Sequence, residues 1–284
     1  MCYKELWQCL TKVYDEGEAK AIARMTYEER FGLTLSDIYL GKDSQLSADS
    51  QAELEEIAKR LLQGEPIQYV LGHADFCGRT FLVNEHVLIP RPETEELCQW
   101  EPLPLPSPKG EGAKILDIGT GSGCIAITLA AMYPQAEVTA WDISAEALVV
   151  ARENARRHNV HVSFEQVDVL NSQLSIVNCQ FDLIVSNPPY ICNKERAGME
   201  TNVLEHEPHT ALFVPDDDPL LFYRAIAQYG QTALKDGGWL YFEINPLYAK
   251  PLHDMLCAMR FCRIEIKEDQ YGKQRMVKAQ RSEK

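Results

Sequence analysis

The residues with the clearest chemical potential are Asn187, Pro188, Pro189 and Tyr190, which follow an apolar stretch that predicts a buried strand at 181–186. The carboxamide oxygen of Asn187 and the carbonyl oxygen of Pro188 are hydrogen-bond acceptors, and two successive prolines stiffen the backbone around them. Such a corner can accept both N–H bonds of an amide, so that the nitrogen lone pair points at an activated methyl group while Tyr190 stacks on the planar amide. We find no convincing general base here, so positioning and electrostatics would carry the rate. A plain proline-rich turn is the competing interpretation.

A glycine-rich turn, Gly119-Thr120-Gly121-Ser122-Gly123, lies between a predicted strand and a predicted helix. Glycine has no Cβ, so backbone N–H groups in this turn can approach a ligand closely at the positive end of the helix. The spacing G-x-G-x-G is weak evidence by itself, because an ordinary tight strand-to-helix turn can also show it.

Two aspartates strengthen the interpretation of the glycine turn as a cofactor site. Asp142 ends the next predicted strand, where an acidic side chain reaches ribose hydroxyls in a doubly wound fold. Asp168 ends the strand after that, and it either meets the adenine region of a ligand or caps the next turn. A dinucleotide would use the same features, but the third glycine comes one residue too early for the G-x-G-x-x-G pattern.

Short apolar strands alternate with helical stretches after Lys114. This alternation predicts βαβ crossovers and a parallel sheet that is covered on both faces. The stretches at 262–269 and 275–280 could close the sheet with a hairpin. Ligands bind beyond the carboxyl ends of the strands in such sheets, so the glycine turn and the Asn-Pro-Pro-Tyr loop should face one crevice.

The chain of 284 residues has room for one large α/β domain and a smaller module. Apolar residues early in the chain recur at helical spacing, for example Leu6, Leu10 and Val13. We therefore expect a helical domain at 1–64, a connecting β-hairpin at 65–92 and the α/β domain at 93–284. The stretch at 101–112 holds four prolines at alternate positions, and we expect it to be an exposed surface insertion.

The charge balance argues against a nucleic-acid partner. The formal net charge is −14, from 42 acidic and 28 basic residues, whereas proteins that bind phosphate backbones cluster Lys and Arg. No stretch approaches the ~18 apolar residues that span a bilayer, and the first residues lack an apolar leader segment. We therefore expect a cytoplasmic protein.

Nine cysteines are present, an odd number without a C-x-x-C pair. This pattern predicts neither a zinc site nor a redox motif. We expect reduced, mostly buried thiols and no bound metal.

Several segments resemble the N5-glutamine methyltransferases that modify peptide-chain release factors, the PrmC/HemK group. The segments are PIQYVLG at 66–72, FLVNEHVLIPRPETEEL at 81–97, ILDIGTGSGCIAI at 115–127, FDLIVSNPPYI at 181–191 and EPHTAL at 207–212. The NPPY motif by itself is shared with adenine-N6 methyltransferases, so it specifies a planar amine or amide. Its combination with PRPETEE is more selective.

The resemblance implies an α/β fold: a class I methyltransferase domain with a seven-stranded, Rossmann-like sheet, together with a small N-terminal helical bundle that docks a release factor. It also implies S-adenosylmethionine as the cofactor and the glutamine of a Gly-Gly-Gln loop as the substrate. The implied cofactor residues are Gly119, Thr120, Gly121, Ser122, Gly123, Asp142, Asp168, Val169 and Asn187. The implied substrate residues are Asn187, Pro188, Pro189 and Tyr190, with Arg91 and Glu95.

The chain departs from the family pattern at a few positions. Val169 stands where some members carry an aromatic residue near the adenine. The fifth strand usually continues as E-I-G, whereas this chain has Glu243-Ile244-Asn245-Pro246. We expect that this last departure and the proline-rich insertion do not touch the proposed chemistry.

Three charged residues before the insertion, Arg91, Glu93 and Glu95, have two possible roles. They could line the entrance for substrate or cofactor, or they could belong to a solvated turn.

Two other functions compete with glutamine methylation. An adenine-N6 methyltransferase could use NPPY to hold the edge of a flipped base, but we find no basic stripe, and the cluster Arg152, Arg156, Arg157 and His158 is expected on a peripheral helix. A non-catalytic adaptor that binds the cofactor is the third possibility. The intact NPPY motif argues against it.

Overall fold

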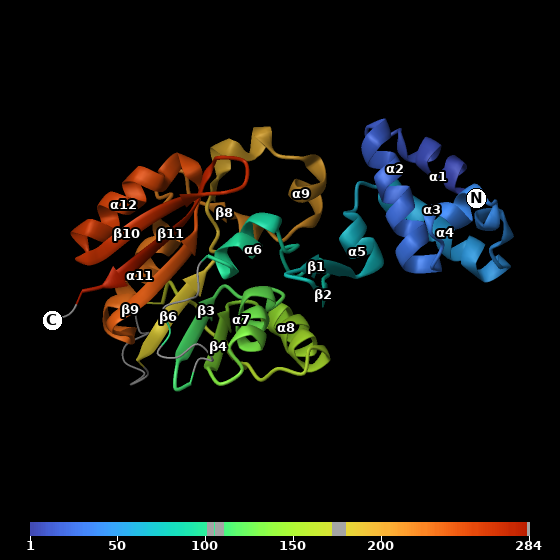
Figure 1. Cartoon of the computed structure of the whole chain (residues 1–284). Helices are drawn as coiled ribbons and strands as arrows, with labels where there is room; N and C mark the ends of the chain where they lie inside the picture. Colours follow the sequence, from blue (N-terminus) through green and yellow to red (C-terminus); the bar gives the residue numbers. More distant parts are fainter. Residues whose placement is uncertain (101–104, 106–110, 172–179, 283–284) are drawn as a thin grey trace. The chain divides into compact units, whose positions relative to one another are not determined.

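The computed structural model describes residues 1–100, 105, 111–171 and 180–282 (Figure 1). The chain divides into two compact units, Met1–His73 with Glu200–His206, and Ala74–Met199 with Glu207–Lys284. Most of the proline-rich stretch predicted at 101–112 lies outside the described residues.

The first unit is helical, as the spacing of its apolar residues predicts. The side chains of Asp15, Thr34 and Ser47 cap three of its helices by accepting the backbone N–H three positions later. A π-helical turn at Thr26–Arg30 follows the second helix, and a 3-10 turn at Lys42–Gln45 precedes the fourth. The α-helices are α1 (Tyr3–Leu10), α2 (Glu16–Met25), α3 (Leu35–Tyr39), α4 (Ala48–Leu62), α5 (Ile67–Leu71) and α9 (Thr201–His206).

One detail of the helical pattern is wrong. Leu6 and Leu10 are fully buried in the core of this unit, as expected. Helix α1 ends at Leu10, however, so Val13 does not continue its apolar face, and this residue is 48% exposed. Periodicity alone does not locate the end of a short helix.

A two-stranded hairpin lies within the predicted connecting region 65–92, formed by β1 (His73–Phe76) and β2 (Arg79–Leu82), whereas the start of that region is helix α5. The two residues between the strands, Cys77 and Gly78, both have positive φ values, 49° and 70°. A two-residue turn with left-handed backbone matches the right-handed twist of the paired strands, and this explains the tight reversal.

The second unit contains the predicted seven-stranded sheet, in the order β10-β11-β9-β6-β3-β4-β5. The five strands β9, β6, β3, β4 and β5 run parallel, and β11 is antiparallel to both β9 and β10. The expected closing hairpin is therefore confirmed. The strands are β3 (Lys114–Ile118), β4 (Glu137–Asp142), β5 (Ser163–Gln166), β6 (Phe181–Ser186), β9 (Leu234–Glu243), β10 (Phe261–Glu268) and β11 (Gln274–Arg281).

Helices connect these strands and cover the sheet. They are α6 (Pro92–Cys98), α7 (Cys124–Met132), α8 (Ala145–Arg157), α10 (His209–Leu212), α11 (Leu221–Ala233) and α12 (Ala249–Ala258), with 3-10 turns at Asn193–Gly198 and Pro246–Tyr248. A small parallel pair, β7 (Ile191–Cys192) and β8 (Phe213–Val214), follows the NPPY loop. In the part of the chain that the structure describes, no helix has the length and apolar character needed to cross a bilayer.

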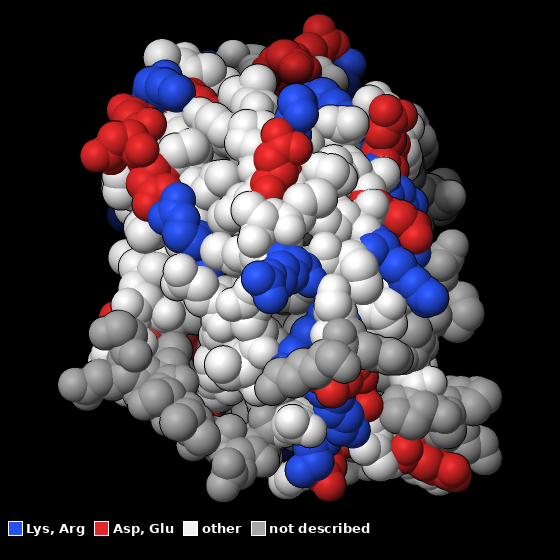
Figure 2. Space-filling model, turned by 90° about the vertical axis from the view of Figure 1, so that its left-hand side faces the viewer, with Lys and Arg blue, Asp and Glu red and all other residues white. Residues whose placement is uncertain are grey.

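Charges of both signs are interspersed on the face of the molecule shown in Figure 2. The basic cluster noted on α8 is also partly neutralised, because Glu153 pairs with Arg156 at 2.7 Å and with Arg157 at 3.1 Å. A duplex-binding surface would need uncompensated cations along one stripe.

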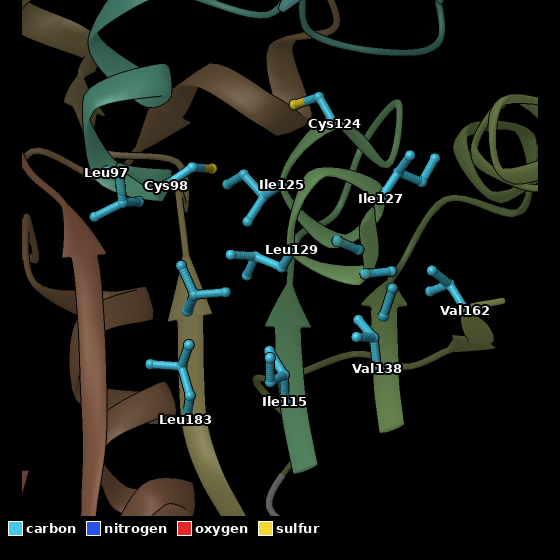
Figure 3. Packing of buried hydrophobic residues seen from close by; sticks show 14 of the residues in the cluster. Leu97, Cys98, Ile115, Cys124, Ile125, Ile127, Leu129, Val138, Val162 and Leu183 are labelled. Atoms are coloured by element: carbon cyan, nitrogen blue, oxygen red, sulfur yellow. The ribbon is translucent and has the colours of Figure 1, made fainter. Parts of the chain in front are cut away.

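The core of the second unit has one layer on each face of the sheet. Successive residues of a strand point to opposite faces, so Ile115 and Leu183 pack in one layer while Leu116 and Ile184 pack in the other. Residues of α6 and α7, among them Leu97, cover the first layer (Figure 3). Helices α11 and α12 supply the second layer.

The cysteines are less buried than the sequence suggests. All eight described cysteines are free thiols, as expected, but three are buried: Cys98, Cys124 and Cys192. The sulfur atoms of Cys98 and Cys124 lie in the layer seen in Figure 3 and act there as small apolar groups.

Candidate active site

One pocket of about 390 Å³ lies beyond the carboxyl ends of β3, β4, β5 and β6. Its volume is within the range of small-molecule sites, and its place is the one expected for ligands of doubly wound sheets. The lining comes from the loops after these four strands, from the segments 86–91 and 208–213, and from residues of α6, α7, α8 and α11, among them Thr94 of α6. The glycine turn and the NPPY loop therefore meet at one cavity, as the sequence predicts.

The glycine turn has left-handed backbone at Gly119, Gly121 and Gly123. Gly119 to Ser122 line the pocket, and the N–H groups of Gly119 and Thr120 both donate to the carbonyl of Trp141, at 2.8 and 3.0 Å. Gly123 has a different role. A Cβ there would lie 2.9 Å from Ile127 Cδ1, so its lack of a side chain allows helix packing rather than ligand contact.

Asp142 lines the pocket and holds the glycine turn. Its carboxylate accepts the N–H of Gly121 at 2.8 Å and the N–H of Ser144 at 2.9 Å. Burial raises the pKa of this carboxyl, and the backbone N–H bonds oppose that shift. Each carboxylate oxygen keeps a further lone pair that can accept a hydroxyl group.

Asp117, just before the turn, has a structural role that the sequence did not reveal. It is fully buried, and its Oδ2 accepts the Thr120 hydroxyl at 2.6 Å and the N–H of Ala126 at 3.2 Å. Desolvation raises the pKa of this carboxyl to about 7. The group ties β3 and the glycine turn to the start of α7.

Asp168 and Val169 both line the pocket on the loop after β5. Asp168 also caps its own turn, since its Oδ1 accepts the N–H of Leu170 at 2.9 Å. The two alternatives considered for Asp168 are thus compatible, because capping uses one oxygen and leaves the other available.

Three residues of the NPPY loop, Asn187, Pro188 and Pro189, line the pocket. The Asn187 side-chain nitrogen donates to the Thr94 hydroxyl at 3.2 Å, and a Cβ on Gly119 would lie 3.9 Å from the Asn187 carbonyl oxygen. The loop therefore lies directly beside the glycine turn. Tyr190 is outside the set of described residues that line the pocket, so its stacking role stays a prediction.

Of the charged residues before the insertion, the structure brings Arg91 to the pocket. Arg91 pairs with Glu207 at 2.5 Å, and Glu207, whose side chain is 1% exposed, also accepts the N–H of Ile89 at 3.4 Å. Glu95 does not belong to the described pocket lining, and its predicted contact with substrate stays untested.

Comparison with known proteins identifies the family. The PrmC N-terminal domain model matches residues 4–72, and the methyltransferase small domain model matches residues 104–210. A release factor glutamine methyltransferase of Bacteroides thetaiotaomicron is 46% identical over 274 residues, which are 96% of this chain and 97% of that protein. The chain belongs to the release factor glutamine methyltransferase family.

Solved structures agree on the fold. A methyltransferase from Pyrococcus furiosus matches with a TM-score of 0.53 and 16% identity, covering 84% of this chain and all of that chain. A Thermus thermophilus 16S rRNA N2 G1207 methyltransferase, solved in complex with AdoMet and guanosine, matches with a TM-score of 0.51 and 19% identity. The match covers 74% of this chain and 49% of that one. Both support the class I methyltransferase architecture.

In this glutamine methyltransferase family member, the sequence missed a buried polar group behind the NPPY loop. Glu243 is 2% exposed, and it accepts the hydroxyls of Thr94 at 2.5 Å and Tyr190 at 2.9 Å. Desolvation raises its pKa, while these two donors and Arg275 oppose the shift. Sequence alone gives a weak signal here, a carboxylate at the end of an apolar strand.

The departure from the family pattern at Asn245 lies against the NPPY loop, but its hydrogen-bond partners among the described residues are not the atoms proposed to accept the substrate amide. Its Nδ2 donates to the carbonyl of Tyr190 at 3.2 Å and to the carboxylate of Glu195 at 3.1 Å. Its Oδ1 accepts the N–H of Leu247 at 3.1 Å and caps the 3-10 turn before α12. Asn245 thereby braces the NPPY loop from behind.

Proposed function

We propose that this chain transfers a methyl group from S-adenosylmethionine to the side-chain amide nitrogen (N5) of the glutamine in a Gly-Gly-Gln motif of a peptide-chain release factor. The observation that carries this proposal is that Asn187, Pro188 and the glycine turn line one pocket. The name of the Bacteroides thetaiotaomicron relative supports the choice of substrate.

The residues present fit the cofactor. A Cβ on Gly121 would enter open space at the pocket, so the glycine leaves room for close approach. Asp142 has lone pairs for ribose hydroxyls, and Asp168 and Val169 would hold the adenine end. The residues that would hold S-adenosylmethionine are therefore Gly119, Thr120, Gly121, Ser122, Asp142, Asp168, Val169 and Asn187. When bound, this cofactor supplies a methyl group that is activated by a positively charged sulfur.

The protein's part of the reaction is to orient a weak nucleophile. An amide nitrogen reacts poorly because its lone pair is delocalised into the carbonyl group. The Asn187 side-chain oxygen and the Pro188 carbonyl would accept its two N–H bonds, which frees the lone pair for in-line attack. Formation of the new N–C bond would break the methyl–sulfur bond of the cofactor, leave that sulfur neutral with the electron pair, and release one proton from the amide nitrogen to water.

We further propose a division of labour along the chain. Residues 1–64 would dock the release factor, residues 65–92 would connect the two parts, and residues 93–284 would carry the reaction. The net charge of −14 favours a protein substrate over a nucleic acid.

The test is methylation of a purified release factor, followed by mass spectrometry of the peptide that contains the Gly-Gly-Gln motif. We expect the mass of one methyl group on that glutamine. The Asn187→Ala variant should lose most of this activity while it still binds S-adenosylmethionine. A release factor whose motif glutamine is replaced by glutamate is the matched substrate control.

Two outcomes would redirect the proposal. Methylation of adenine in an oligonucleotide, with an unmodified release factor, would support the adenine-N6 function. Retained cofactor binding without methylation of either substrate would support a non-catalytic adaptor.

A further inference from the structure

Glu243 lies at the carboxyl end of β9, next to the strand that leads into the NPPY loop. The sheet pairs Phe242, its neighbour in β9, with Ser186, the last residue of β6. Glu243 and Asn187 thus each follow one residue of this pair, and the Glu243 side chain is buried. A buried carboxylate needs donors, and Glu243 receives them from the hydroxyls of Thr94 and Tyr190.

The bond between Thr94 and Glu243 fixes the direction of the next bond. A hydroxyl has one proton, and Thr94 donates it to the Glu243 carboxyl group at 2.5 Å. Toward Asn187 the same oxygen can therefore only accept. The Asn187 Nδ2 donates to it at 3.2 Å.

We propose that Glu243 and Thr94 are positioning residues that turn the Asn187 carboxamide so that its oxygen faces the substrate nitrogen. This inference rests on the proposed function, in which that oxygen accepts a substrate N–H bond. A carboxamide rotated by half a turn would present two N–H groups to the substrate amide, and donor would face donor. Glu243 and Thr94, which are far apart in the sequence, thus control the orientation of one acceptor, the Asn187 side-chain oxygen.

The position of Thr94 in the fold holds its hydroxyl group in place. Its side chain is 3% exposed on α6, whose Leu97 is packed in the core layer of Figure 3. Both the hydroxyl and the carboxylate are therefore held by buried elements, and Thr94 also borders the pocket that Asn187 lines.

The first experiment compares Thr94→Val, which has the same shape without the hydroxyl, with Thr94→Ser, which keeps it. We expect the kcat for release factor methylation to fall about 10- to 100-fold in Thr94→Val, as for the loss of an oriented hydrogen bond in an active site. The KM for the release factor and the Kd for S-adenosylmethionine should change less than about threefold. Thr94→Ser should restore most of the kcat.

The matched control is Thr128→Val in α7. Thr128 is fully buried, lies outside the pocket lining, and its hydroxyl has no hydrogen-bond partner among the described residues. The Thr128→Val variant should show an unchanged kcat. A similar kcat loss in both valine variants would overturn the proposal.

The second experiment is a double-mutant cycle. Glu243→Gln keeps the shape but offers an NH₂ group, which lets the Thr94 hydroxyl turn toward the Asn187 oxygen. The cycle is measured in a Tyr190→Phe background, which removes the other hydroxyl that donates to Glu243. If Thr94 and Glu243 then act only through Asn187, Thr94→Val with Glu243→Gln should be no slower than the slower single variant. Losses that multiply would show independent roles and overturn the proposal.

A third measurement does not depend on activity. Protein labelled with ¹⁵N at asparagine gives side-chain NH₂ signals, and Asn187→Ala assigns the signal of Asn187. We expect slow hydrogen exchange of this NH₂ group in the wild type and in Thr94→Ser, and fast exchange in Thr94→Val. Equal exchange rates in the wild type, Thr94→Ser and Thr94→Val would overturn the proposal. An inactive wild type with the expected exchange pattern would instead count against the proposed substrate.

Discussion

The Tyr190 hydroxyl donates a hydrogen bond to the buried carboxylate of Glu243 at 2.9 Å, and this bond anchors the last residue of the NPPY motif to the end of β9. The Tyr190 carbonyl is held as well, by the side chain of Asn245. The ring packs against the core layer that contains α11 and α12. Tyr190 therefore fixes the loop that carries Asn187.

The Tyr190→Phe variant should be less stable than the wild type, because Glu243 then keeps one hydroxyl donor instead of two. Loss of a buried hydrogen bond to a charged group costs about 1 to 3 kcal/mol. Urea unfolding measures this loss. The kcat should fall less than in Asn187→Ala, since the acceptor oxygens stay in place.

Stacking of the ring on the substrate predicts the opposite pattern. Tyr190→Phe would then keep its activity, because the aromatic ring remains, and Tyr190→Leu would lose kcat without a matching loss of stability.

Two glycine substitutions should separate folding from cofactor binding. In Gly123→Ala, the new Cβ meets Ile127 at 2.9 Å and Ala151 at 3.2 Å, at a φ of 82°, so we expect a stability loss of about 2 to 4 kcal/mol. Gly121→Ala meets nothing within 4 Å, and its φ of 54° costs about 1 to 2 kcal/mol. Its main effect should be weaker binding of S-adenosylmethionine.

Thermal unfolding and calorimetric titration measure the two effects. If the Gly121→Ala variant binds the cofactor as tightly as the wild type, this turn does not belong to the cofactor site.

Asp142→Asn should weaken cofactor binding about 10-fold or more. The carboxylate accepts the N–H groups of Gly121 and Ser144 with different oxygens, and an amide has one oxygen for both. One backbone donor loses its partner, and the glycine turn shifts from its binding position. Asp168→Asn is the control, because this exposed residue holds one N–H bond, that of Leu170, and should show a smaller change in Kd. An Asp142→Asn variant that binds S-adenosylmethionine as tightly as the wild type would contradict the role assigned to Asp142.

The parts of the fold that follow from local pattern could be predicted, and long-range pairs could not. Ile115 and Leu116 point to opposite layers because strand side chains alternate, a rule that needs no knowledge of neighbours. Thr94 and Glu243 are 149 positions apart, and their contact depends on the order of strands in the sheet.

The same limit on predicting long-range pairs applies to the residues around the pocket. Both loops were expected at the carboxyl ends of parallel strands, since ligands of such sheets generally bind there. The pairing of Arg91 with Glu207 was not expected, because Glu207 is 116 positions away in the sequence and its burial depends on tertiary packing.

Asp117 should make the stability of the wild type fall as pH rises toward neutrality. Desolvation raises the pKa of this carboxyl to about 7, against an ordinary value of 3.8, so between these values the folded protein holds a proton that the unfolded chain has lost. The stabilising effect of that proton is complete below the ordinary pKa and is lost as pH rises through about 7. Asp117→Asn cannot ionise, so its unfolding free energy relative to the wild type should increase by roughly 2 to 3 kcal/mol between pH 5 and pH 8. Urea unfolding of both proteins at several pH values measures this difference, and a difference that is constant across the range would show that Asp117 is ionised in the folded state.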